Sequence, residues 1–476
     1  MSNDFDKKNK CKSSEDSLVR ELKKVDAVPF HMPGHKRQDF GHLLGVERFD
    51  YTEIEGTDNL HDARGILKDA MEHAADVFSV RATRFLVDGS TCGILAGIRA
   101  TSKRGDAILV ARNCHKSVYN AIELLGLVPE YIMPECIGEF GLYGSVEPSK
   151  VESLLEKTGA KLVVITSPTY EGVISNVKAI ADVCHRHGAI LFVDEAHGAH
   201  LGFDGFEDSA RTLGADIVVN SLHKTLPSLT QTALLHVCSE RVDIKRLDES
   251  LAMFETSSPS YVLMASIDGC VRYAENGLEN WAKNVDDLRA AFADLKYIKL
   301  FDGNGRVFAY DKSKLVFLLS ACNLSGIEFA NILREKYGIE LEMASLDYAI
   351  AMTGAGDTPD MYAALERAVK EIDGSVSLEH KNQLGTKTSI FVELPKKAFN
   401  SYEIDSLSVE YANTRDIVGR VSAENIWAYP PGAPVVVKGE IVDENRLAYL
   451  NLLLDAGVSV SSSLKNFPKN LAVVKR

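Results

Sequence analysis

The stretch DIVVNSLHK, residues 216–224, decides the fold and carries the residue on which the chemistry depends. Its β-branched core at 217–219 predicts a buried strand, and the polar SLHK follows where that strand would end. A second apolar run, AILFV at 189–193, ends in Asp194. Two parallel strands that end in this way place a carboxylate, a hydroxyl, an imidazole and an amine at one edge of a sheet. Open α/β sheets bind their ligands at that edge.

This set of side chains suits the cofactor pyridoxal 5'-phosphate (PLP). The amine of Lys224 can bind an aldehyde covalently, and the carboxylate of Asp194 can keep a pyridine nitrogen protonated so that the ring accepts electrons. Ser221 and His223, beside the lysine, can then hold the phosphate. Each residue also has an ordinary structural interpretation, because a lysine after a strand is usually a solvated loop charge and an aspartate there is often a helix N-cap.

A second motif adds a signal for phosphate binding. The apolar run at 85–87 is followed by DGSTCG at 88–93, and a helix is expected over 94–100. Glycine permits close backbone approach, hydroxyls donate hydrogen bonds and a helix N-terminus favours an anion, so Ser90 and Thr91 are candidates for the phosphate site. The same residues are also ordinary turn and helix-cap composition.

His115 is the candidate for stacking on a flat cofactor ring. It lies in RNCHKS at 112–117, between a strand expected over 107–110 and a helix that ends at Leu125. This junction belongs to the same sheet edge as Ser90. The alternative interpretation is that His115 simply caps the helix.

The alternation of strands and helices predicts a mostly parallel sheet with right-handed crossovers, an α/β fold. Further strands are expected over 162–166 and 234–237, with a helix over 177–187 between them. Beyond residue 266 the pattern changes to that of a smaller α/β unit, and a linker near 374–386 precedes the last ninety residues or so. We therefore expect four parts: an N-terminal segment (1–45), a large cofactor-binding domain (46–270), a small α/β domain (271–385) and a C-terminal α+β domain (386–476).

The composition narrows the class of protein. The net charge of −14 argues against a nucleic-acid binder and against attraction to an anionic membrane. No apolar run approaches the length needed to span a bilayer, and the polar N-terminus is no secretory signal, so we expect a cytoplasmic protein.

The eight cysteines contain no CxxC pair and indicate reduced thiols. We expect no metal, because Pro33-Gly34 breaks the helix on which His31 and His35 would have to lie to bind one metal ion together. A short leading helix is expected over 14–24.

With these residues in hand, the chain resembles the Orn/Lys/Arg decarboxylases, PLP enzymes of fold type I, in the short form that lacks a receiver-like N-terminal domain. The matching motifs follow the family's order along nearly the whole chain: FHMPGHKR (30–37), DGSTCG (88–93), RNCHKS (112–117), SPTYEG (167–172), VDEAHGAH (193–200), SLHKTLPSLTQ (221–231), TSSPSY (256–261) and YPPGAPVVVKGE (429–440). The chain departs from the family at Leu226-Pro227, where relatives often carry glycines.

The resemblance implies specific roles. It makes Lys224 the lysine that carries the cofactor, Asp194 the partner of the pyridinium nitrogen and His115 the stacking residue, and it assigns the phosphate to Ser90, Thr91, Ser221 and His223. His197 matches a position near the cofactor ring. The implied reaction is α-decarboxylation of a basic amino acid, with arginine favoured over lysine or ornithine, by a homodimer or a dimer of dimers that makes a polyamine-pathway amine.

Two other functions and one open question remain at this point. The same fold supports aminotransferases, aldolases and carbon–sulfur lyases, and a non-catalytic PLP-binding homologue is a further alternative. The site for the distal cation of the substrate is open as well. Acidic residues within 53–62, or Glu255, are candidates for it, although solvated surface charge is an equally good interpretation of these residues.

Overall fold

The computed structural model describes residues 28–30, 51–53, 56–137, 141–303, 305–378, 393–429 and 432–476. The leading helix expected over 14–24 and the basic turn at 31–37 lie outside these residues. The same holds for most of the linker expected near 374–386.

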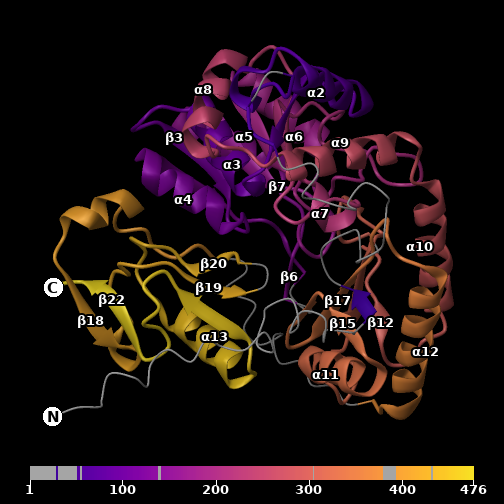
Figure 1. The fold of residues 1–476 in the computed structure, drawn as a ribbon. Helices are drawn as coiled ribbons and strands as arrows, with labels where there is room; N and C mark the ends of the chain where they lie inside the picture. The colour runs from indigo at the N-terminus through magenta and orange to yellow at the C-terminus, as the bar shows by residue number, and fades with distance from the viewer. Residues whose placement is uncertain are drawn as a thin grey trace, which may run out of the picture.

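A seven-stranded sheet forms the centre of the large part of the molecule (Figure 1). All of its strands are parallel to one another except β11, which is antiparallel to both neighbours. Their order across the sheet is β2 (Ala82–Leu86), β11 (Ala233–Val237), β10 (Ile217–Ser221), β9 (Ile190–Asp194), β7 (Leu162–Thr166), β3 (Ala107–Ala111) and β4 (Val128–Ile132). The parallel strands therefore bring their carboxyl ends to one edge.

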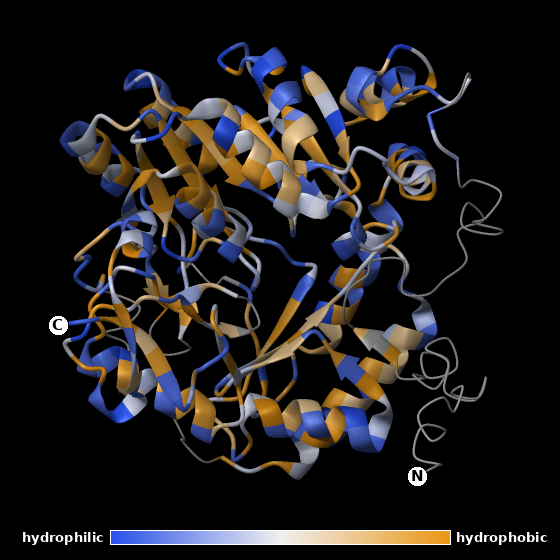
Figure 2. Ribbon diagram, turned by 60° about the vertical axis from the view of Figure 1, so that its left-hand side comes forward, coloured by the Kyte–Doolittle hydropathy of each residue, from blue (hydrophilic) through white to orange (hydrophobic). Residues whose placement is uncertain are grey.

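Helices connect these strands and cover the sheet: α2 (Ile66–Val77), α3 (Gly89–Thr101), α4 (Lys116–Leu125), α5 (Pro148–Thr158), α6 (Val177–Arg186) and α8 (Ile244–Phe254). Hydrophobic residues concentrate in the strands that the helices cover, and hydrophilic residues face outward (Figure 2). Helix α3 approaches the sheet closely because it carries Gly97, where a Cβ would lie 2.6 Å from the ring of Phe192 on β9. The start of α3 is thereby fixed against the site-bearing strands.

A second, four-stranded sheet forms the small part, with the order β12 (Lys299–Leu300), β14 (Lys314–Leu318), β17 (Tyr348–Met352) and β16 (Met343–Ala344), all antiparallel. The helices around it are α10 (Glu279–Ala291), α11 (Gly326–Tyr337) and α12 (Pro359–Ser375), and α9 (Tyr261–Glu275) leads into them. Strand β1 (Val28–Phe30) pairs in parallel with β15 (Ile339–Leu341), so the indigo β1 lies among orange elements in Figure 1.

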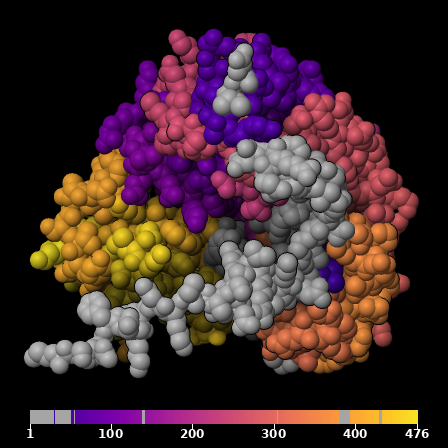
Figure 3. Space-filling model, viewed as in Figure 1, coloured from indigo at the N-terminus to yellow at the C-terminus, as the bar shows by residue number. Residues whose placement is uncertain are grey.

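The C-terminal part contains a helix, α13 (Glu444–Asp455), and two small sheets: β18 (Val409–Asn413) with β22 (Asn470–Val474), and β20 (Pro434–Val436), β19 (Ile426–Tyr429) and β21 (Ser459–Ser462). Short two-stranded pairs, β5 (Cys136–Ile137) with β6 (Leu142–Tyr143) and β8 (Val173–Ile174) with β13 (Ala309–Tyr310), complete the sheets among the described residues. The C-terminal part, yellow in Figure 3, lies against the large part. Arg112 of the large part and Glu440 form a buried ion pair across this contact.

The elements agree closely with the sequence patterns where periodicity is strong. Strand β7 has the expected bounds, whereas α3 begins at Gly89 rather than at residue 94. The earlier start arises because the Gly-Ser-Thr segment itself forms the first helical turn instead of a loop before it. The backbone N–H groups of that turn have no acceptor within the helix and are therefore available to a ligand.

Candidate active site

The carboxyl edge of the large sheet contains a cavity of about 310 Å³. Asp194 is the last residue of β9 and Ser221 the last of β10, while Lys224 lies in the helical turn α7 (Leu222–Thr225) that follows. Residues at the starts of α3 and α4 complete this edge. All eight site residues expected from the sequence line the cavity: Ser90, Thr91, His115, Asp194, His197, Ser221, His223 and Lys224.

Lys224 is held as an amine that loses its proton more readily than an ordinary lysine. Burial lowers its pKa to about 8, an effect that Asp194 and Glu342 partly oppose. Its Nζ lies 3.0 Å from Nε2 of His197, whose own pKa is well below the usual value because of burial and the nearby Lys224. The imidazole is therefore neutral and can accept a hydrogen bond from the amine.

Asp194 is almost completely shielded from solvent, since it is only 3% exposed. Among the described residues it accepts one hydrogen bond, from the backbone N–H of Ala196 at 3.2 Å. Burial raises its pKa, and Lys224 opposes that effect. A buried carboxylate in this state is stabilised by a cationic N–H donor. The protonated ring nitrogen of PLP is a donor of that kind.

Hydroxyl groups and a helix N-terminus meet on another side of the cavity. Ser221 Oγ donates to Ser90 Oγ at 2.9 Å, so the end of β10 and the first turn of α3, which carry expected phosphate ligands, touch. Gly89 has φ +75°, which is accessible to glycine and lets the chain turn directly into α3. His223 lies beside them with its Nδ1 3.0 Å from the carbonyl oxygen of Thr232. This donor set fits a phosphate.

His115 caps a helix and also lines the cavity. As the N-cap of α4, its Nδ1 accepts a hydrogen bond from the backbone N–H of Ser117 at 3.3 Å. The same side chain lines the cavity. Burial and the nearby Lys224 lower its pKa to about 4, so the ring is neutral at physiological pH. Capping fixes the ring at the edge where a planar cofactor would lie.

The sequence reasoning assigned no role to several other residues that line the cavity: Asn113, Tyr143, Thr166, Thr169, Tyr170, Glu171, Gln231 and Ala433. Asn113 and Thr166 were detectable, since each lies at the end of a parallel strand. Asn113 Oδ1 and His197 Nδ1 are buried and have no hydrogen-bond partner among the described residues. A bound ligand or an ordered water would supply the missing hydrogen bonds.

A buried charged cluster supports the loop that carries His197. Lys314 of β14 donates to the backbone oxygen of His197 at 3.3 Å, and its Nζ lies 3.5 Å from Asp311. Asp311 in turn contacts His200 Nε2 at 3.1 Å. These groups connect the small sheet with the segment after β9, so the position of His197 depends on both parts of the molecule.

Glu255 lies away from this cavity. It lines a separate cavity of about 360 Å³ beside α2 and β2, where it accepts a hydrogen bond from the backbone N–H of Val87 at 2.7 Å. Burial raises its pKa to about 7. Asp58 accepts backbone hydrogen bonds from Arg64 and Gly65, and Asp62 pairs with Arg64. These contacts organise the 56–67 loop and give no support to a role of these carboxylates in binding the substrate cation.

Three further observations on the described residues concern disulfides, metal clusters and membrane-spanning helices. The cysteines from Cys92 onward are free in the described residues, and those residues contain no cluster of side chains suited to a metal ion. Among the same residues, no helix has the length and apolar character needed to cross a bilayer.

Comparison with models of known protein families shows to which family the chain belongs. The family model described as "Orn/Lys/Arg decarboxylase, major domain" matches residues 18–316, and the model for the C-terminal domain of the same family matches residues 380–460. The chain belongs to the Orn/Lys/Arg decarboxylase family. It is therefore an amino-acid decarboxylase by family, as the motifs around Lys224 had indicated.

Individual relatives agree with this assignment. The chain is 32% identical to an arginine decarboxylase of Bacillus subtilis, over 94% of this chain and 95% of that protein. It is also 32% identical to an arginine decarboxylase of Halalkalibacterium halodurans, over 95% of each chain. The solved structure of lysine decarboxylase A from Pseudomonas aeruginosa superposes with a TM-score of 0.75 and 19% identity, over 90% of this chain and 74% of that one. The fold is thus that of fold type I PLP enzymes, as expected from the sequence.

Proposed function

We propose that this decarboxylase removes the α-carboxylate of arginine and produces agmatine and CO₂ with PLP as its cofactor. The observation that carries the proposal is the juxtaposition of Lys224, Asp194 and the Ser90–Ser221 contact in one cavity. Support for arginine comes from the two relatives named arginine decarboxylase, which align with the chain over nearly its full length.

In this proposal, different residues of the cavity bind different parts of the cofactor. Lys224 would hold the aldehyde carbon, Asp194 would pair with the pyridinium nitrogen, and His115 would lie against the ring, with His197 close by. Ser90, Thr91, Ser221 and His223 would hold the phosphate. When bound, PLP supplies an electron-accepting ring that takes up the electrons of the bond to the departing CO₂.

The chain itself supplies the proton that replaces the carboxylate at Cα. Lys224 and His115 both line the cavity, but their different pKa values give them different protonation states. The pKa of Lys224 is about 8 and that of His115 about 4, so near pH 7 the amine carries a proton and the imidazole does not. Lys224 is therefore the better proton donor, and the neutral His197 beside it can hold the amine in position.

The test measures CO₂ and amine products from purified, PLP-loaded protein that is given arginine, lysine and ornithine separately. We expect agmatine and CO₂ in equal amounts from arginine and none from the Lys224→Ala variant. Equal rates with lysine would remove the preference for arginine. Transfer of the amino group to a keto acid without CO₂ release would instead indicate an aminotransferase, and the absence of turnover with any amino acid would indicate a non-catalytic homologue.

The remaining expectations from the resemblance stand as parts of this proposal. They are a homodimer or a dimer of dimers and use of the amine product in polyamine synthesis. The cytoplasmic location expected from the polar N-terminus is likewise a proposal. The division into parts at residues 45, 270 and 385 is likewise a proposal. It is supported by the separate sheets of the large, small and C-terminal parts.

A further inference from the structure

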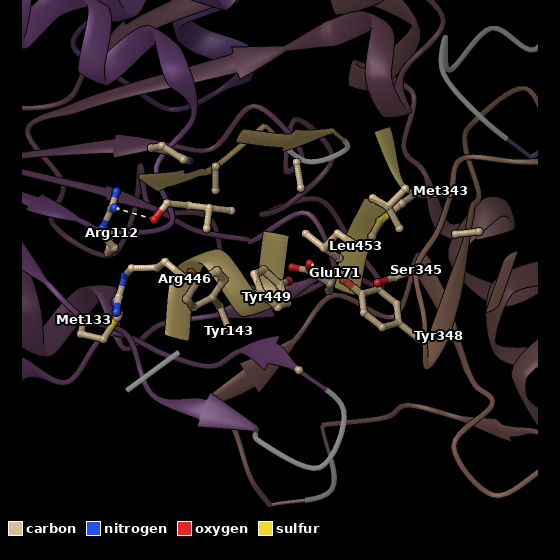
Figure 4. Close-up of a pocket in the computed structure, with 17 residues that line it drawn as sticks. Arg112, Met133, Tyr143, Glu171, Met343, Ser345, Tyr348, Arg446, Tyr449 and Leu453 are labelled. Carbon is tan, nitrogen blue, oxygen red and sulfur yellow. Dashed lines mark hydrogen bonds between the residues drawn. The ribbon is translucent and has the colours of Figure 1, made fainter. Parts of the chain in front are cut away.

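A second, smaller cavity of about 80 Å³ adjoins the cofactor cavity. Tyr143, Glu171 and Ala433 line both cavities and therefore lie on the boundary between them. The smaller cavity lies where the three parts of the chain meet, since its walls come from the large part, from residues 343–348 and from the C-terminal part. Figure 4 shows Glu171 among side chains of the small and C-terminal parts.

Glu171 is an unusual carboxylate because it is buried without a cation. Its side chain is 5% exposed, and no lysine, arginine or histidine among the described residues forms an ion pair with it. Its side-chain hydrogen bonds come from neutral hydroxyls, those of Tyr348 at 3.2 Å and of Thr169. Burial raises its pKa. A buried carboxylate that lacks a countercharge is costly, and a cationic ligand that enters the cavity removes that cost.

The walls around Glu171 suit a planar cation. Three phenol rings, those of Tyr143, Tyr348 and Tyr449, line the cavity together with the apolar side chains of Met343 and Leu453 (Figure 4). Aromatic faces attract cations, and a guanidinium group is more weakly hydrated than an ammonium group, so it enters an apolar, ring-lined site at lower cost. A compact ammonium ion would lose more of its hydration in the same place.

The two arginines that line the far side of the cavity do not compete for Glu171. Arg112 pairs with Glu440 at 3.0 Å, and Arg446 pairs with Asp443 at 2.7 Å. Both guanidinium groups are thus already neutralised by carboxylates of the C-terminal part. Glu171 remains the carboxylate of this cavity for which the described residues provide no countercharge.

We propose that Glu171 binds the distal guanidinium of the substrate and that the cavity formed with Tyr348 is the specificity pocket. The inference rests on the proposed function, because it assigns the far end of the same substrate whose α-carbon faces Lys224. It replaces the acidic residues at 53–62 and Glu255 as the distal-cation site. It also gives a physical reason for a preference for arginine over lysine.

The experiment measures binding of three amines to the PLP-loaded protein by calorimetry: agmatine, cadaverine and hexylamine, which lacks a distal cation. The wild-type protein is expected to bind agmatine about 10- to 100-fold more tightly than hexylamine, with cadaverine between them, as a charge-assisted hydrogen bond predicts. Glu171→Gln keeps the shape and should reduce that ratio to below about threefold. Tyr348→Phe removes only the hydroxyl donor and should give an intermediate ratio.

Glu342→Gln is the matched control. Glu342 is also a carboxylate near Lys224 and accepts a short hydrogen bond from the hydroxyl of Tyr170, but it lines neither cavity. Its variant should keep the agmatine preference. The inference is overturned if Glu171→Gln keeps the preference, if Glu342→Gln alone abolishes it, or if the wild-type protein shows none.

The outcomes separate this inference from the proposed reaction. Release of CO₂ from arginine by a protein whose agmatine preference does not depend on Glu171 would leave the reaction standing and remove the specificity pocket. If the preference for agmatine depends on Glu171 but the protein does not decarboxylate arginine, the specificity pocket stands and the proposed reaction falls.

Discussion

The buried ion pair between Arg112 and Glu440 offers a quantitative test of how the C-terminal part is held. Arg112 Nη2 and Glu440 Oε2 are 3.0 Å apart, and the side chains are 3% and 1% exposed. Arg112 follows β3 and precedes His115 by three residues, so the pair connects the C-terminal part to the cofactor edge. Glu440→Ala leaves the guanidinium buried without its carboxylate. Removal of one partner from a buried pair costs about 3–5 kcal/mol.

This cost translates into a measurable change in melting temperature. An unfolding entropy of about 2.1 cal/mol/K per residue gives roughly 1 kcal/mol/K for a chain of this length. If the protein unfolds in one transition, Glu440→Ala should therefore lower Tm by about 3–5 °C in differential scanning calorimetry at pH 7. If the C-terminal part unfolds separately, the loss appears as a larger shift of that part's own transition.

An exposed ion pair of nearly the same length is the control. Lys178 and Asp182 are 2.9 Å apart on α6, but their side chains are 64% and 53% exposed. Asp182→Ala should cost less than about 0.5 kcal/mol, since solvent screens such pairs. The double variant Arg112→Met with Glu440→Leu should recover most of the stability lost in Glu440→Ala, because apolar groups replace a buried pair at little cost. Equal effects of Asp182→Ala and Glu440→Ala would refute the argument from burial.

Three further predictions concern the cofactor edge. Lys224→Met should raise the Tm of the PLP-free protein below pH 8, and the difference should shrink between pH 8 and 10.5, because the folded protein binds the lysine proton less tightly than the unfolded chain does. Asp194→Asn should weaken PLP binding by about 10- to 100-fold in a titration of the PLP-free protein, as loss of a charged hydrogen bond predicts; unchanged affinity would contradict its assignment. His115→Ala should weaken PLP binding by about 2- to 10-fold, whereas His115→Phe should keep it, because the stacking ring remains.

The sequence was sufficient to locate the cofactor edge because the rule behind it is local. A residue that directly follows a parallel strand lies at the carboxyl edge, so recognising β9 and β10 placed Asp194 and Lys224 together. The rule needs no knowledge of which strands are neighbours. For this reason all the expected site residues line one cavity, although they come from segments more than a hundred residues apart.

Other features had no local signal. Strand β4 was missed because its sequence, VPEYI, contains Pro129 and a glutamate, and such a strand is tolerated because β4 is an edge strand paired only with β3. The environment of Glu171 was equally hidden. Its contact with Tyr348 joins residues far apart in the sequence and depends on how the small part packs against the large one. Packing between sheets is set by the whole fold and leaves no periodic pattern in either segment.

The pairing of β1 with β15 has a consequence for the synthesis of the protein. Val28 is synthesised about 310 residues before its partner Ile339. At about 5–20 residues per second, β1 therefore waits roughly 15–60 s for the strand beside which it belongs. During that interval its backbone edge is open to other chains. Phe30 is a fully buried residue of the core of the small part. Phe30→Asp should prevent β1 from pairing with β15. The variant should therefore aggregate more during synthesis than after refolding of the full-length protein.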